Sequence, residues 1–335
     1  SFIGGGRNNQ ATYYRNFIGA GVGNEAYCQN TVIGGGDFNC ACGNTSAIVG
    51  GAGNLTRGLR SFIGAGNSNT ACGENSAIAG GQSNLIANTG YASFIGGGQQ
   101  NTVSNQYSFI GGGILNTASG NSSTLSGGYG NIASGAYATV AGGRSNTASG
   151  YCSIVGGGQC NTASGGYSGT FSGCYNCSTG NNSFVGGGNK NIACGFGSIV
   201  VGGGTFSAAV NNIASGAGSF IGGGGGAMMS GHTVSGAYSS IVGGFGFLQG
   251  HVIGGAGSFI GGGCGTNPHC IDGNASSIVG GSRNTIGPGS NCSFIGGGNN
   301  NCTAGYHAII AGGSSGNVDR KSTRLNSSHT DISRM

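Results

Sequence analysis

The chain of 335 residues contains no tryptophan and only two prolines, and charged residues make up only 5% of it. Its apolar runs all fall short of the ~20 residues that a membrane-spanning helix requires, so we expect no membrane span. The basic residues before residue 319 are scattered along the chain, unlike the clustered positive charge of a nucleic-acid-binding surface. We therefore expect no nucleic acid among the partners.

Acidic residues are equally scarce, and no two of them before residue 319 are close together in sequence. Acid–base catalysis needs positioned pairs of titratable groups, and no Ser/His/Asp grouping stands out either. A phosphate-binding loop ends in Lys-Ser/Thr, which no glycine run here does. A calcium-binding β-roll needs an aspartate in every turn, but Asp37 and Asp272 are the only aspartates before residue 319. We predict that the chain is not an enzyme and holds no cofactor or metal.

The last seventeen residues differ in composition from the rest of the chain. Residues 319–329 read DRKSTRLNSSH, which resembles the translation of a short-read sequencing adapter. We therefore expect residues 1–313 to form the folded array and residues 314–335 to be a non-native or disordered tail, with a natural basic tail as the alternative. The chain starts directly on a repeat without an apolar leader, so we expect it to be part of a longer protein.

What the sequence has in abundance is glycine, 82 residues, arranged in a repeat of about fifteen residues. One period, SFIGGGILNTASGNS, runs from Ser108 to Ser122, and we number its positions one to fifteen. Position three is aliphatic in nearly every copy, which argues against glycine-rich disorder. It predicts an all-β fold, a parallel β-roll or β-solenoid of stacked ~15-residue coils. The residues assigned to position three are Ile3, Ile18, Ile33, Ile48, Ile63, Ile78, Ile95, Ile110, Leu125, Val140, Val155, Phe171, Val185, Val200, Ile221, Val242, Ile253, Ile260, Val279, Ile295 and Ile310.

Position two must face away from position three, because side chains alternate along a strand. It is often phenylalanine, and a column of such rings is an exposed apolar stripe of the kind that marks an interface. We therefore predict that this oligomer stripe packs against other copies of the chain. Its phenylalanines are Phe2, Phe17, Phe62, Phe94, Phe109, Phe184, Phe220, Phe259 and Phe294.

Position nine is asparagine with unusual regularity. Asparagine tolerates left-handed backbone, and its amide can bond to the equivalent amide one coil away, so we predict an asparagine ladder along the turns. A row of asparagines that binds a glycan is the alternative. The next three residues, as in Thr147-Ala148-Ser149, place alanine inward and threonine and serine outward. The clearest members of the ladder are Asn101, Asn116, Asn131, Asn146 and Asn161.

The pairing of Ser93-Phe94-Ile95-Gly96 with Asn116-Thr117-Ala118-Ser119-Gly120 resembles the head repeats of YadA-like trimeric autotransporter adhesins, over nearly the whole chain to Gly313. Related repeats occur in fibre proteins of phages and large viruses. The resemblance implies a left-handed β-roll, a homotrimer, and a place at the cell surface, anchored in an outer membrane as part of a longer chain, or in a virion. Phe-Ile-Gly partly replaces the usual inner alternation, which leaves open which face lines the trimer axis. No stalk or anchor accompanies the repeats.

The thirteen cysteines depart further from that family. Their odd number and irregular spacing do not indicate a disulfide framework. Cys42, Cys72 and Cys194 stand at position twelve, where other coils have serine, and we expect them to be reduced packing residues. Reduced cysteines favour synthesis in a reducing compartment, and hence a virion protein over an exported one.

Two short motifs could hold zinc only with ligands from elsewhere. The Cys174–Cys177 motif offers two ligands, and the segment from Cys264 to Cys270, which contains His269, offers three at most. We expect the remaining histidines His232, His251 and His307 to be isolated surface or turn residues.

The period becomes irregular over residues 202–276, where insertions at 222–231 and 261–273 are either contact loops or decayed repeats. We predict a structural and adhesive fibre that attaches to an unknown host-surface protein or glycan. The alternative is an ice-binding solenoid with a flat threonine face. That face would carry Thr102, Thr117, Thr147 and Thr162, each two residues before a serine.

Overall fold

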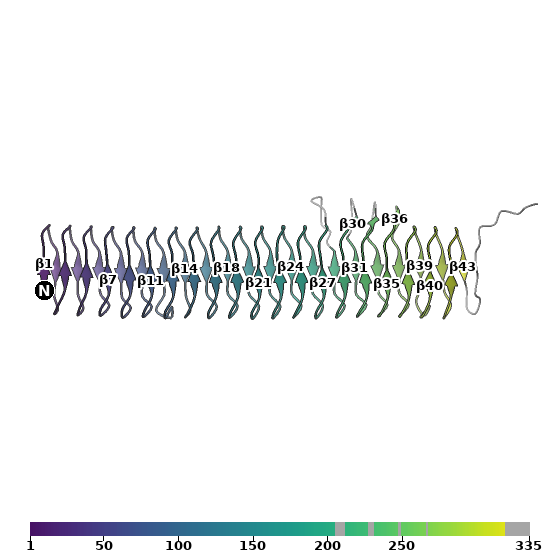
Figure 1. Ribbon diagram of the computed structural model, residues 1–335, viewed down its shortest axis with the longest axis horizontal. Coiled ribbons are helices and arrows are strands. Elements are labelled where there is room, and N and C mark those ends of the chain that lie inside the picture. The colour runs from purple at the N-terminus through teal and green to yellow at the C-terminus, as the bar shows by residue number, and fades with distance from the viewer. Residues whose placement is uncertain (205–211, 227–230, 247–248, 266, 319–335) are drawn as a thin grey trace, which may run out of the picture. The chain divides into compact units, whose positions relative to one another are not determined.

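The computed structural model describes residues 1–204, 212–226, 231–246, 249–265 and 267–318. The described residues divide into two compact units, one within residues 1–164 and one within residues 165–335. Within each unit, short parallel strands stack turn upon turn into a β-solenoid, and no helix occurs among the described residues (Figure 1). This confirms the predicted all-β solenoid of ~15-residue coils.

The N-terminal unit contains two parallel sheets, one on each side of the coil. The first sheet is built from positions two and three. Its strands are β1 (Phe2–Ile3), β3 (Phe17–Ile18), β5 (Val32–Ile33), β7 (Ala47–Ile48), β9 (Phe62–Ile63), β11 (Ala77–Ile78), β13 (Phe94–Ile95), β15 (Phe109–Ile110), β17 (Thr124–Leu125), β19 (Thr139–Val140) and β21 (Ile154–Val155). The second sheet is built from positions ten and eleven. Its strands are β2 (Gln10–Ala11), β4 (Glu25–Ala26), β6 (Cys40–Ala41), β8 (Leu55–Thr56), β10 (Thr70–Ala71), β12 (Leu85–Ile86), β14 (Thr102–Val103), β16 (Thr117–Ala118), β18 (Ile132–Ala133), β20 (Thr147–Ala148) and β22 (Thr162–Ala163).

The C-terminal unit repeats this arrangement and adds a short side sheet. Its first-sheet strands are β23 (Gly169–Thr170), β25 (Phe184–Val185), β27 (Ile199–Val200), β29 (Phe220–Ile221), β32 (Ser240–Ile241), β35 (Phe259–Ile260), β38 (Ser277–Ile278), β40 (Phe294–Ile295) and β42 (Ile309–Ile310). Its second-sheet strands are β24 (Cys177–Ser178), β26 (Ile192–Ala193), β28 (Ile213–Ala214), β31 (Thr233–Val234), β34 (Val252–Ile253), β37 (Cys270–Ile271), β39 (Thr285–Ile286), β41 (Cys302–Thr303) and β43 (Asn317–Val318). The side sheet is formed by β30 (Gly225–Gly226), β33 (Phe245–Gly246) and β36 (Cys264–Gly265).

The core lies between the two main sheets and is one side chain thick on each side. Ile110 of the first sheet and Ala118 of the second sheet are both fully buried, as the alternation of side chains requires. The same positions pair from coil to coil, so that Ile95 lies beside Ile110 and Val103 beside Ala118. Each buried aliphatic contributes about 1.5–3 kcal/mol of apolar transfer free energy, and the stacking repeats that contribution in every turn.

Four of our assignments to position three were wrong. Phe171, Val242 and Val279 are exposed, and the buried residue is the one before each of them, such as Ile241. Ile253 is buried but belongs to the second sheet, where it pairs with Val234. In the coils of Phe171, Val242 and Val279, position one is a buried serine, such as Ser239, and the buried residue of position three follows two residues later.

The asparagines of position nine form a buried ladder between the two sheets. The backbone N–H of Asn131 donates to Oδ1 of Asn116 at 3.0 Å. The Nδ2 of Asn116 donates in turn to the carbonyls of Gly112 and Gly128, both at 3.0 Å. Between Asn24 and Asn39 the side-chain amides also bond directly, at 3.1 Å. Each asparagine thus satisfies buried backbone groups that would otherwise lack partners.

We expected left-handed backbone at the asparagines of position nine, but the left-handed residues lie at other positions of the turns. Position nine has no positive φ in the described turns; the non-glycine residues with positive φ lie at positions eight and fifteen, as at Leu115 (60°) and Ser122 (54°). At position six glycine is required, because Gly113 has a φ of 89° and a Cβ there would lie 2.2 Å from the carbonyl oxygen of Gly128. Position seven adds a one-residue ladder on this turn, for example between Ile114 and Tyr129.

The irregular stretch consists of lengthened turns that remain in register with their neighbours. Extra residues enter between positions six and nine, and there the side sheet pairs Gly225 with Phe245 and Phe245 with Cys264. The main strands on either side of each insertion keep the same pairing, because the insertions leave from one turn only.

The array also continues beyond Gly313, since β43 pairs with β41 and Val318 is fully buried.

Candidate functional site

The outward side of the first sheet carries the predicted oligomer stripe. Phe94 and Phe109 are 37% and 40% exposed, and their rings stack with centroids 5.7 Å apart. Phe2 and Phe17 stack in the same way at 5.5 Å. The stripe phenylalanines Phe62 and Phe294 are also exposed, whereas Phe184, Phe220 and Phe259 are half-buried.

Several rings lie beside the glycine that follows two residues later on the same face. A Cβ placed on Gly111 would lie 3.6 Å from Cε1 of Phe109, and one on Gly222 would lie 3.4 Å from Cε1 of Phe220. These are ordinary van der Waals distances, so the rings lie along the outward face of their own strands.

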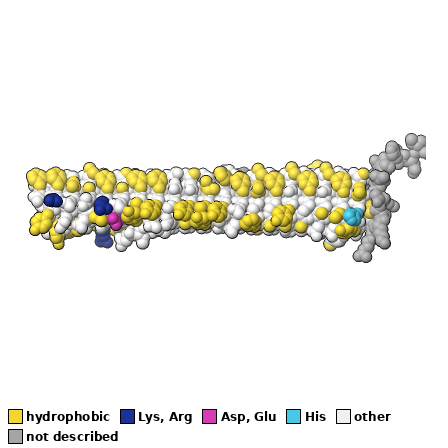
Figure 2. All heavy atoms as spheres, turned by 60° about the horizontal axis from the view of Figure 1, so that its bottom comes forward, with side chains coloured by type: hydrophobic (Ala, Val, Ile, Leu, Met, Phe, Trp, Pro, Cys, Tyr) yellow, Lys and Arg dark blue, Asp and Glu magenta, His cyan; other side chains and the backbone are white. Residues whose placement is uncertain are grey.

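In some coils with a small residue at position two, a large side chain stands at position four instead. In the C-terminal unit Gly169 is followed by exposed Phe171, Ser240 by exposed Val242, and the row continues without a gap in the described turns. Phe171 contacts Phe184 of the next turn, with ring centroids 5.3 Å apart. In the N-terminal unit the coils of Ala77, Thr124 and Thr139 interrupt the row, because position four is also small there. Neither position is charged in any described turn, and Figure 2 shows hydrophobic side chains gathered in rows across successive turns.

The outward side of the second sheet carries the threonine column. Thr102 pairs with Thr117, and Thr147 pairs with Thr162, all four half-buried. Ile132 interrupts the column in register and is 39% exposed. The threonines therefore lie in one row, but the row is neither uniform nor fully hydroxylated.

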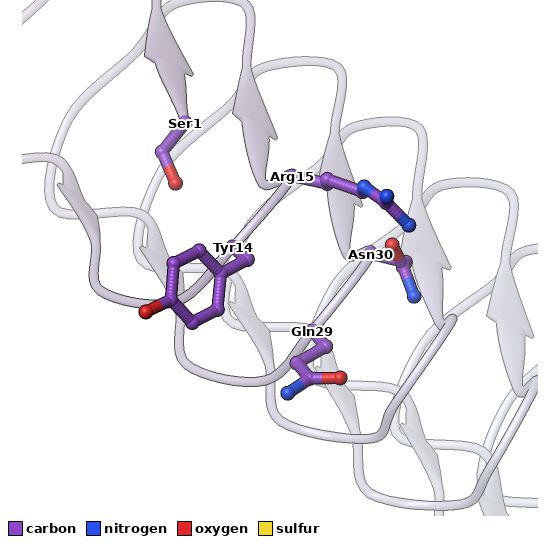
Figure 3. A pocket seen from close by; sticks show the side chains of 5 residues that line it. All are labelled: Ser1, Tyr14, Arg15, Gln29 and Asn30. Carbon is purple, nitrogen blue, oxygen red and sulfur yellow. The ribbon is translucent and has the colours of Figure 1, made fainter.

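A third surface is the turn at positions thirteen to fifteen, where tyrosines gather in the N-terminal unit. We call the turn segment with Tyr91, Tyr107, Tyr137 and Tyr151 the tyrosine edge; all four rings are exposed. Further toward the N-terminus, the same turn forms a shallow hollow of about 580 Å³. Tyr14-Arg15 and Gln29-Asn30, from two adjacent turns, line the hollow together with Ser1 (Figure 3).

Histidines replace the asparagine of position nine in three successive turns of the C-terminal unit. His232, His251 and His269 are buried and stacked, with ring centroids 5.0 Å and 4.8 Å apart. Nδ1 of His232 accepts the backbone N–H of His251 at 2.9 Å, as Oδ1 of asparagine does elsewhere. We expected His232 and His251 to be isolated surface or turn residues; that was wrong, because both are buried and stacked on other histidines. The signal was present in the sequence, because each histidine directly precedes a second-sheet strand and is followed four residues later by glycine, as in His232-Thr233-Val234-Ser235-Gly236.

The histidine column is held neutral by its surroundings. Burial lowers the pKa of His232 to about 4 and that of His251 to about 3, with repulsion from its two neighbours adding to the effect at His251. Burial also lowers the pKa of His269. Among the described residues, the Nε2 atoms of all three rings are buried without a hydrogen-bond partner. A proton added there would place a charge in a site without a counter-ion.

The cysteines lie mostly on the outward side of the second sheet and on the turns. Cys40 and Cys42 are joined by a disulfide, with Cα atoms 5.8 Å apart, so the expectation that Cys42 is reduced was wrong. Positions ten and twelve point to the same side of one strand, which brings the two sulfur atoms together. The other eleven cysteines are free, including Cys72 and Cys194 of position twelve.

The proposed metal ligands do not converge. The structure brings no three histidine, cysteine, aspartate or glutamate side chains into a metal-binding group within its described residues. Cys174 lies at position seven and Cys177 at position ten, on different parts of the coil. The asparagines cannot contact a glycan directly, since Asn101, Asn116 and Asn131 are fully buried.

The expected contact loops at 222–231 and 261–273 fall partly outside the described residues, which exclude 227–230 and 266. The described part of the chain contains no helix long and apolar enough to cross a membrane. Neither the models of known protein families nor the curated proteins include a match to this chain.

Proposed function

We propose that this chain is a non-catalytic module of a structural and adhesive fibre, which trimerises through the outward face of its first sheet. The observation that carries the proposal is the uncharged row of large, mostly exposed apolar side chains at positions two and four. Interface centres are depleted in charge and enriched in aromatic residues, as this row is. The number three and the place at a cell surface or in a virion come from the resemblance to YadA-like head repeats and viral fibres.

The proposal is tested by the mass of the full chain in solution. Light scattering under reducing conditions should give about 97 kDa, three times the 32.2 kDa mass of the chain. The double substitution Phe94→Ser and Phe109→Ser should shift the mass toward the monomer, because it removes a stacked pair from the centre of the row.

A matched control removes an equally exposed apolar side chain from the opposite sheet. Leu85 is 37% exposed in the second sheet, and Leu85→Ser should leave the trimer intact. A soluble monomeric wild-type chain would contradict the proposal. Dissociation caused by Leu85→Ser and not by the phenylalanine substitutions would place the seam on the second sheet.

A second candidate function is ice binding, which the in-register threonine column favours. It predicts that the chain inhibits ice recrystallisation, that Thr117→Leu weakens the inhibition, and that Ile132→Thr strengthens it by making the column uniform. Absence of inhibition at high protein concentration would eliminate this candidate.

A further inference from the structure

The tyrosine edge consists of two aromatic pairs in the N-terminal unit. They lie along the edge where successive coils bend at positions thirteen to fifteen. The rings of Tyr91 and Tyr107 meet edge to face with centroids 5.5 Å apart, and those of Tyr137 and Tyr151 meet in the same way at 5.7 Å. Tyr107 and Tyr137 are each 55% exposed. The pairs are therefore held in place by their own contacts while ring surface remains open to solvent.

The two pairs have a fixed spacing along the edge. The backbone N–H of Tyr107 bonds to the carbonyl of Tyr91, and that of Tyr137 bonds to the carbonyl of Asn121 in the intervening turn. Tyr107 and Tyr137 are therefore two coils apart, and two coils span roughly 10 Å at the strand spacing of ~4.8 Å. This is about the length of two sugar residues in an extended β-1,4-linked polysaccharide.

The backbone at these tyrosines is not one that tyrosine favours. Tyr107 and Tyr137 have φ values of 56° and 57°, in the left-handed region. The same position carries asparagine at Asn30 and Asn75, which suits that conformation better. Position fifteen adopts this conformation with many residue types, such as Thr45 and Ser122, so the turn geometry does not call for tyrosine.

The surface between the pairs is polar and uncharged. Asn121 and Ser122 lie between them, half-buried, and Ser122 donates its hydroxyl hydrogen to Oδ1 of Asn121 at 2.8 Å. The turn residues from Tyr91 to Tyr151 at positions thirteen to fifteen include no charged side chain. Aromatic faces with neutral amide and hydroxyl groups between them match the C–H faces and hydroxyls of sugars.

We propose that the tyrosine edge binds a neutral, extended β-1,4-linked polysaccharide. Sugar rings two residues apart along the polymer stack on Tyr107 and Tyr137, and hydroxyl groups in between bond to Asn121 and Ser122. The inference rests on the adhesive role proposed above, to which it assigns a class of ligand.

The test is co-sedimentation of the full chain with insoluble cellulose and chitin, and calorimetry with their soluble hexasaccharides. The double variant Tyr107→Asn and Tyr137→Asn removes both rings and installs the residue that this turn carries elsewhere, so it should fold at least as well as the wild type. Two lost stacking contacts should weaken binding by about tenfold or more. Tyr129→Ser is the matched control, because Tyr129 is exposed on the opposite turn of the same unit.

The possible results separate this inference from the proposed fibre. Undiminished binding by the double variant, or no binding of either polysaccharide by a trimeric wild-type chain, would overturn the inference and leave the trimer standing. Binding to a proline-rich peptide with the same tyrosine dependence would also overturn it, because extended peptides too can dock on aromatic surfaces. A monomeric wild-type chain that binds the polysaccharides through these tyrosines would uphold the inference and contradict the trimer.

Discussion

The buried histidine column should make the lengthened turns of the C-terminal unit sensitive to acid. His232, His251 and His269 stack between the sheets, and burial lowers the pKa of each of them in the folded state. The unfolded state therefore takes up protons first as the pH falls. The free energy of unfolding is highest above about pH 7. It begins to decrease near the ordinary histidine pKa of about 6.5 and decreases further until the pH reaches the folded-state pKa.

The size of the effect follows from these pKa values. At pH 5 the folded state still keeps His232 and His251 neutral, since their pKa values are about 4 and about 3. This pH is about 1.5 units below the ordinary pKa of histidine in the unfolded state. Protonation of the unfolded state therefore lowers the free energy of unfolding by about 2 kcal/mol per histidine. Two such residues lower the local stability by about 4 kcal/mol, a large part of the 5–15 kcal/mol that stabilises a typical domain.

Hydrogen exchange is the suitable assay, because a repeat array can open locally without unfolding as a whole. The backbone N–H groups of His251 and His269, which donate to the preceding imidazoles at 2.9 Å and 3.0 Å, should lose protection between pH 7.5 and pH 5 after correction for intrinsic rates. The corresponding N–H groups of Asn131 and Asn146 in the N-terminal unit should not change.

A variant with all three histidines replaced by asparagine provides the control. Asparagine fits this column, since Asn212 occupies it in a turn that is also lengthened and accepts the N–H of His232 at 2.8 Å. The variant should keep its protection at pH 5. The reasoning would be refuted if the wild-type turns kept full protection at pH 5, or if the asparagine variant lost protection to the same extent.

Three further substitutions test the packing of the N-terminal unit by chemical denaturation. Asn131→Ala removes three hydrogen bonds from a fully buried site and should destabilise by about 2–4 kcal/mol, because it strands buried backbone groups. Gly120→Ala places a Cβ 2.0 Å from a carbonyl oxygen of the next turn and should prevent proper stacking, whereas Gly112→Ala, with 4.0 Å of space, should be tolerated. Ile110→Ala, at a fully buried site, should cost about 2–5 kcal/mol, whereas Ile114→Ala, at a 41% exposed site, should cost much less; equal losses would contradict the assigned core.

The sequence by itself determined the architecture. A period of about fifteen residues with one aliphatic side chain at position three and one alanine at position eleven can be buried only by stacking identical coils. The same alternation determined that the phenylalanines face outward and that position nine meets its own equivalent in the next turn. These conclusions needed only local rules, because every residue contacts the residue one period away.

Only the tertiary structure decided the reading frame where two apolar residues are adjacent. Hydrophobicity could not distinguish Ile241 from Val242, since the choice depends on which of them lies in register with the buried column. The sequence carried the strand pattern that follows each histidine, but only the structure showed that the three rings stack, because insertions of different length separate them in sequence. The position-two and position-four exchange and the spacing of the tyrosine edge also depend on register. Register is the alignment of each coil with the next, so it can be assigned only once the strands that pair between coils are known.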